Sequence, residues 1–119
     1  MDTKTVKNVV IIFSDKEKLN QVKKNFPISQ FHVLLANSGE EAIELVKSKT
    51  PSLIVMDVAL NGMDGIETCQ IIRKNLNLYQ PVIIFLAEQL ENYTQNAAYE
   101  AGADDFLPYS MRSRLLKRV

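Results

Sequence analysis

The amino-acid sequence predicts one α/β domain built around a parallel five-stranded sheet. Short apolar runs, rich in β-branched residues, recur about every 20 to 25 residues, and polar segments with apolar residues three or four positions apart separate them. Short continuous runs are typical of strands buried on both faces of a sheet, and the wider spacing is typical of amphipathic helices. Their alternation predicts a (βα)5 order, and 119 residues suffice for one such domain and its core.

The five apolar runs are the predicted strands. In chain order they cover residues 9–13, 31–35, 53–56, 82–86 and, more weakly, 106–107. Runs of this length are ordinary for strands and too short for most helices. Helices are therefore expected between the runs and after the last one.

Turn and capping residues predict where the helices begin and end. Ser38 and Glu41 have the spacing of a capping box, and they open a helix that Pro51 is expected to stop. Its apolar stripe consists of Ala42, Ile43, Leu45 and Val46. Asp64 is expected to cap the third helix, and Gly102 to end the fourth in a left-handed conformation. The third helix carries Ile66, Cys69, Ile72 and Leu76, and its cysteine is expected to pack as a small hydrophobe.

Charge and hydropathy exclude several classes of protein. The 14 basic residues balance the 14 acidic ones, so no overall positive field predicts nucleic-acid binding. The longest apolar run is far shorter than the ~20 residues that a membrane helix needs, and the first residues lack the apolar stretch of a signal peptide. We therefore expect a cytoplasmic protein that contacts neither membranes nor, through this domain, nucleic acid.

Two carboxylates stand where predicted strands end. Asp57 closes the third apolar run, and Asp15 follows the first. Ligands of open α/β sheets bind outside the carboxyl ends of the strands, so the two side chains are expected to converge on one edge. A buried carboxylate destabilises a fold unless it is paired or bound to a metal, which indicates chemistry at Asp57. Neighbouring carboxylates suit a hard divalent cation such as Mg2+.

With these positions placed, the chain resembles a response-regulator receiver domain over residues 1–119. The matching positions are Asp15, Ser38 to Ala42, Asp57, Gly62 to Gly65 and Ala101 to Leu107. The resemblance implies a flavodoxin-like, doubly wound sheet of order 2-1-3-4-5. It also implies that Asp57 accepts a phosphoryl group from a histidine kinase or phosphotransfer protein. Mg2+ would be held by Asp15, Asp57 and the backbone carbonyl of Ala59.

Several matched positions depart from the family pattern. Ser14 replaces one of two acids after the first strand, so Mg2+ is expected to bind weakly or not at all. Leu86 replaces the Ser or Thr that donates to the phosphoryl group. Tyr109 replaces the lysine that pairs with that group, and a phenol carries no charge at pH 7. Phe106 occupies the switch-aromatic position, and Leu86 is expected to fill the space beside it and to bias the domain toward one conformation.

These departures leave two hypotheses open. In the first, the chain is a phosphorelay receiver with a weakened phospho-switch. In the second, it is a pseudo-receiver that works without phosphate, as a homodimerisation or protein-interaction module. An enzyme is a poorer interpretation, because the sequence has no P-loop, no G-x-G-x-x-G and no histidines at metal-ligand spacing. The predicted last helix, residues 111–119, is shorter than the family's, which favours an N-terminal fragment of a longer regulator whose output domain is absent here.

Overall fold

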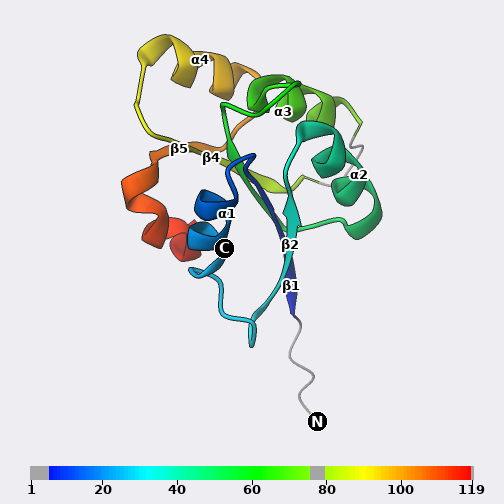
Figure 1. Ribbon diagram of the computed structural model, residues 1–119. Coiled ribbons are helices and arrows are strands. Elements are labelled where there is room, and N and C mark those ends of the chain that lie inside the picture. Colours follow the sequence, from blue (N-terminus) through cyan, green and yellow to red (C-terminus); the bar gives the residue numbers. More distant parts are fainter. Residues whose placement is uncertain (1–5, 76–79, 119) are drawn as a thin grey trace.

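The computed structural model of the chain describes residues 6–75 and 80–118, and it confirms the parallel sheet (Figure 1). Five strands lie in the order β2-β1-β3-β4-β5, and every neighbouring pair is parallel. Their bounds are β1 Lys7–Ile12, β2 Phe31–Ala36, β3 Leu53–Asp57, β4 Val82–Ala87 and β5 Asp105–Pro108. Each predicted run overlaps one of these strands, and the order is the one that the family resemblance implied.

Helices cover both faces of the sheet. Their bounds are α1 Lys16–Lys23, α2 Gly39–Lys49, α3 Gly65–Lys74, α4 Asn92–Glu100 and the 3-10 helix η1 Tyr109–Arg118. None of the helices in these described ranges is long and apolar enough to cross a bilayer. α1 and η1 lie on one face, and α2, α3 and α4 lie on the other (Figure 1). Because both faces are covered, the strands are apolar on both sides and appear in the sequence as continuous runs.

The ends of α2 follow the predicted capping residues, with one difference. The Ser38 hydroxyl accepts the N–H of Glu41 at 3.2 Å. The Glu41 carboxylate accepts the N–H of Asn37 at 2.8 Å, so the return bond of the capping box goes to the residue before Ser38. At the other end Thr50 takes a left-handed conformation, with a φ of 42°, directly before Pro51. The proline therefore marks the end of the helix as predicted.

Asp64 and Gly102 also behave as predicted. Asp64 accepts the N–H of Glu67 at 2.8 Å and opens α3. Gly102, which follows α4, has a φ of +110°, a conformation that a side chain would strain. Leu76, the last predicted apolar residue of the third helix, lies outside the described residues.

Cys69 is buried inside the layer between the sheet and its helices. The side chain is fully enclosed, and its thiol donates to the carbonyl of Ala101 at 3.4 Å. Burial raises the pKa of Cys69 to about 11, so the thiol stays protonated at neutral pH. The predicted packing role is confirmed.

The terminal segment differs from the predicted helix over residues 111–119. It begins two residues earlier, at Tyr109, and forms 3-10 turns with a kink at Met111. Leu115 is fully buried and anchors the segment against the same face of the sheet as α1. Long uninterrupted runs of 3-10 helix are uncommon, which agrees with the kink at Met111. Val119 lies outside the described residues.

Candidate functional site

Asp57 closes the central strand β3 at the carboxyl edge of the sheet. Its side chain is half-buried, and one carboxylate oxygen accepts the N–H of Ala59 at 3.2 Å. Burial raises the pKa of the Asp57 carboxyl above the ordinary aspartate value, while the Ala59 N–H and the Lys18 ammonium act against that shift. The ionised carboxylate is thus poorly solvated, and a cation beside it would be stabilising.

The loop after Asp57 folds back tightly against it. The N–H of Gly65, the first residue of α3, donates to the carbonyl of Val58 at 2.8 Å. A Cβ at Gly65 would collide with the backbone carbonyl oxygen of Asp57. Glycine therefore allows α3 to begin directly against the acid, and this contact fixes the backbone that carries the carboxylate.

Asp15, the second predicted carboxylate, follows β1 and caps α1. Its Oδ1 atom accepts the N–H of Glu17 at 2.9 Å and that of Lys18 at 3.3 Å. The Glu88 carboxylate raises the pKa of the Lys18 ammonium most, and Asp57 and Asp15 add to the shift. Both predicted acids therefore lie near one ammonium group, as expected for side chains that share an edge of the sheet.

Donor atoms for a divalent cation are few at this edge. Among residues 6–75 and 80–118, no group of three or more His, Cys, Asp or Glu side chains is placed to hold a metal ion. The candidate donors are the carboxylates of Asp15 and Asp57 and the backbone carbonyl of Ala59; Ser14, next to Asp15, brings a hydroxyl and no carboxylate. Mg2+ in proteins commonly uses one or two carboxylates and keeps several waters, so this donor set fits a largely hydrated ion.

Ser14 joins three loops of this edge. Its hydroxyl donates to the carbonyl of Asn37, which follows β2, at 3.1 Å. The same oxygen accepts the N–H of Asn61 in the loop after β3 at 3.0 Å. An ionised carboxylate at this position could accept the second bond but could not donate the first. Ser14 therefore has a structural role, which the sequence analysis, in treating it only as the replacement of an acid, did not predict.

Leu86 and Phe106 lie on opposite faces of the sheet, so the expectation that Leu86 fills the space beside Phe106 is wrong. Leu86 is fully buried in the cluster that contains Leu115, on the face covered by α1 and η1. Phe106 packs on the other face, where its ring centre lies 6.1 Å from that of Phe85. The register explains the difference: Phe106 pairs with Phe85 and Leu107 with Leu86, and paired residues share a face.

Tyr109 directs its hydroxyl to α1. The hydroxyl donates to Oε1 of Gln21 at 2.8 Å and lies 3.3 Å from the carbonyl oxygen of Lys18. Two cations contact the ring: the Lys18 ammonium lies 5.6 Å from its centre, and the Arg112 guanidinium lies 4.7 Å from it. Tyr109 thus fixes the first turns of α1 through its hydroxyl, and two cationic side chains pack against its uncharged ring.

Lys18 is the site residue that the sequence analysis missed. Its ammonium lies 2.7 Å from a carboxylate oxygen of Glu88, just beyond β4, and its side chain is 28% exposed. The available signal was its place three residues after Asp15, in the first turn of a helix that begins at the carboxyl edge of the sheet. That spacing does not reveal the direction of the side chain, which depends on Tyr109 and Glu88.

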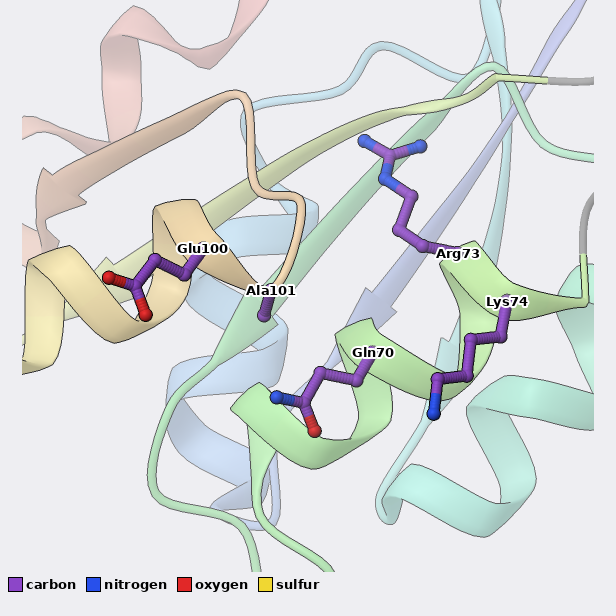
Figure 2. A pocket seen from close by; sticks show the side chains of 5 residues that line it. All are labelled: Gln70, Arg73, Lys74, Glu100 and Ala101. Carbon is purple, nitrogen blue, oxygen red and sulfur yellow. The ribbon is translucent and has the colours of Figure 1, made fainter.

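A pocket elsewhere on the molecule does not belong to this site. It has a volume of about 420 Å³ and lies between α3 and the end of α4 (Figure 2). The lining residues are Gln70, Arg73, Lys74, Glu100 and Ala101. The last turns of helices in a parallel α/β fold lie at the edge opposite the carboxyl ends of the strands, so the pocket and Asp57 are at different edges. Arg73 donates to the carbonyls of Gly102 at 2.9 Å and Pro81 at 2.8 Å, which is a structural role.

The fold and the acid-bearing edge define a receiver domain. The family model of the response regulator receiver domain matches residues 9–119, and the chain belongs to that family. The chain is 31% identical over 108 residues to the alkaline phosphatase synthesis transcriptional regulatory protein PhoP of Bacillus subtilis (strain 168). That match covers 89% of this chain and 44% of PhoP, so the chain spans less than half the length of this curated relative.

Solved structures show the same fold. A putative response regulator from Chloroflexus aurantiacus J-10-fl is 24% identical, with a TM-score of 0.84 over 96% of this chain and 97% of the other. The phosphorylated cyanobacterial phytochrome response regulator RcpA is 16% identical, with a TM-score of 0.83 over 96% of this chain and 91% of the other. At these identities the likeness concerns the fold alone.

Proposed function

We propose that Asp57 is the phosphoacceptor of this receiver domain. Receiver domains of response regulators act in two-component signalling and interact with histidine kinases or phosphotransfer proteins. The observation that carries the assignment is a half-buried carboxylate at the end of the central strand, with its backbone fixed by Gly65 and its ionised form poorly solvated. RcpA, which has the same fold, has been solved in a phosphorylated form, in line with this role.

In the transfer, a carboxylate oxygen of Asp57 attacks the phosphorus in line. The P–N bond to the imidazole of the donor breaks, and the imidazole keeps the electron pair. The Ala59 N–H, which already donates to the Asp57 carboxylate, orients the attacking group. Receiver domains typically bind Mg2+. Here Asp15, Asp57 and the Ala59 carbonyl would hold it, weakly because Ser14 stands in place of an acid, and it would neutralise phosphoryl oxygens.

The phospho-switch of this domain is weakened in our proposal. Leu86 offers no hydroxyl to a phosphoryl oxygen, and its buried side chain packs away from Phe106. The Tyr109 hydroxyl is used by Gln21 on α1. A phosphoryl group shifts a conformational equilibrium only by its differential interaction with the two states, so losing both recognition groups reduces the shift.

A second candidate function is a phosphorylation-independent pseudo-receiver that acts through homodimerisation or protein contacts. The hydrogen bonds between the Tyr109 hydroxyl and α1 favour this alternative. They give the residue that stands in place of a phosphate-recognising lysine a structural role instead. On this alternative, variants of Asp57 would leave partner binding unchanged.

Intact mass after incubation with acetyl phosphate and Mg2+ tests the two candidates. A phosphoacceptor gains one phosphoryl group, Asp57→Asn gains none, and Glu67→Gln, which removes an exposed carboxylate from α3, reacts as the wild type does. Calorimetry measures Mg2+ binding by the same variants, and Asp15→Asn and Asp57→Asn should each abolish the weak binding. A wild type that stays unmodified while Asp57→Asn still binds its partner would favour the pseudo-receiver.

The regulator's output lies outside this domain in our proposal. PhoP is a transcriptional regulator, and the matched part covers 44% of it. We assign DNA binding, if the whole regulator controls transcription, to a separate output domain that follows residue 119, and we place the protein in the cytoplasm.

Gel filtration of the domain with and without beryllofluoride tests whether it forms a homodimer.

A further inference from the structure

A positive charge reaches the site from an unexpected element. The family's phosphate-binding lysine is represented by Tyr109, which has no charge at neutral pH. The ammonium of Lys18 nevertheless lies over the Tyr109 ring, 5.6 Å from its centre. The cation therefore comes from the first turn of α1, while the residue after β5 supplies an aromatic surface for it.

The ammonium of Lys18 lies at the edge of the sheet that carries the acids. Its Nζ atom lies 2.7 Å from Oε1 of Glu88, and the charges of Asp57 and Asp15 add to the rise that Glu88 causes in the pKa of Lys18. The Tyr109 hydroxyl lies 3.3 Å from the Lys18 carbonyl, so the aromatic residue also fixes the backbone that carries the lysine. The Glu88 side chain is 62% exposed, which makes it a partner that water can readily replace.

We propose that Lys18 pairs with the phosphoryl group on Asp57, and that Glu88 holds Lys18 while Asp57 is unmodified. This inference rests on the proposed role of Asp57 as phosphoacceptor. A phosphoryl group brings about −1.5 to −2 charges and three acceptor oxygens, against a single charge on Glu88. The four-carbon stem of lysine is flexible, so the ammonium can change partners without movement of α1.

Exchange of partners has a consequence for the loop after β4. Glu88 lies between β4 and α4, and in the unmodified state its ion pair ties that loop to α1. Loss of the pair releases the loop when Asp57 is phosphorylated. The domain thereby has a way to report modification at the β4–α4 loop that does not require a hydroxyl at Leu86.

The test compares Lys18→Gln with Lys23→Gln, which removes an exposed lysine from the last turn of the same helix. With acetyl phosphate and Mg2+, Lys18→Gln should lower the rate of phosphoryl gain at least about tenfold, because a charge-assisted hydrogen bond is lost. Lys23→Gln should react at the wild-type rate. Tyr109→Lys added to Lys18→Gln should restore the rate, a rescue that a merely structural role for Lys18 would not produce.

Glu88→Gln provides the opposite perturbation. Releasing Lys18 from Glu88 should raise the rate several-fold, and a decrease would overturn the inference because it would make the ion pair a structural support. Equal rates for Lys18→Gln and Lys23→Gln, with a normally modified wild type, would overturn the role of Lys18 and leave Asp57 as phosphoacceptor. A wild type that gains no phosphoryl group would overturn both.

Discussion

Replacing Ser14 tests whether this residue borders the acidic edge and holds its loops together. The Ser14 hydroxyl makes two hydrogen bonds, to the carbonyl of Asn37 and from the N–H of Asn61. Each is worth about 1 kcal/mol, and partial exposure reduces that figure, so Ser14→Ala should lower the free energy of unfolding by about 1–2 kcal/mol. For a domain of this length, that corresponds to a fall in melting temperature of roughly 3–10 °C.

Ser14→Asp should combine this loss with a new charge. The carboxylate can accept from Asn61 but cannot donate to Asn37, and it adds repulsion near Asp15 and Asp57. Without metal, the variant should therefore melt no higher than Ser14→Ala. With Mg2+ it should gain more stability than the wild type, because a third carboxylate joins the donor set.

Melting curves with and without Mg2+ measure these effects, and Ser14→Asn is the matched control. Asparagine has the shape of aspartate without its charge, and its amide can donate to the Asn37 carbonyl, so this variant carries neither the added repulsion nor the lost donor. Equal melting temperatures for the Asp and Asn variants, together with equal responses to Mg2+, would refute the reasoning and place Ser14 outside the acidic cluster.

Three further predictions follow from the same contacts. Burial raises the pKa of Asp57, so its contribution to stability is present below the unfolded-state pKa of about 4 and is lost as the pH rises through the folded-state pKa. Urea unfolding should accordingly show Asp57→Asn to be more stable than the wild type at pH 7 and equally stable near pH 3; an equal gain at both would contradict this. Leu86→Thr with Tyr109→Lys should cost about 2–4 kcal/mol, since Leu86 is fully buried, yet should enlarge the beryllofluoride-induced amide NMR shift of Phe106. A large shift already in the wild type would contradict that recovery. Arg73→Gln should lower the free energy of unfolding by about 2–3 kcal/mol, because the guanidinium makes three hydrogen bonds, and should leave phosphorylation unchanged.

The sequence predicts the sheet and its helices well, because burial on two faces and on one face leaves different periodicities. It also places Asp57 and Asp15 at one edge, since strand ends of a parallel sheet share an edge by geometry. The prediction that Leu86 lies beside Phe106 was wrong. The relative position of the two side chains depends on the register between β4 and β5, which neither short apolar run specifies alone. The bridging role of Ser14 depends on three loops meeting, and loop conformations leave no periodic signal.

Lys18 was missed for a related reason. A lysine in the first turn of a polar helix is ordinarily a solvated charge, and its sequence neighbours do not distinguish one direction from another. Its direction here follows from Glu88 and Tyr109, which lie 70 and 91 positions away along the chain. Contacts of that separation become visible only when the fold brings the elements together.

The enclosed thiol of Cys69 can be used to measure local opening of the domain by chemical labelling. With a pKa raised to about 11 and no solvent access, this single cysteine cannot react with a thiol reagent while α3 and α4 stay packed. Labelling must then proceed through transient separation of these helices from the sheet, and its rate measures the free energy of that opening. Phosphorylation, metal binding or a partner protein that loosens or tightens this layer would change the labelling rate, without any added probe.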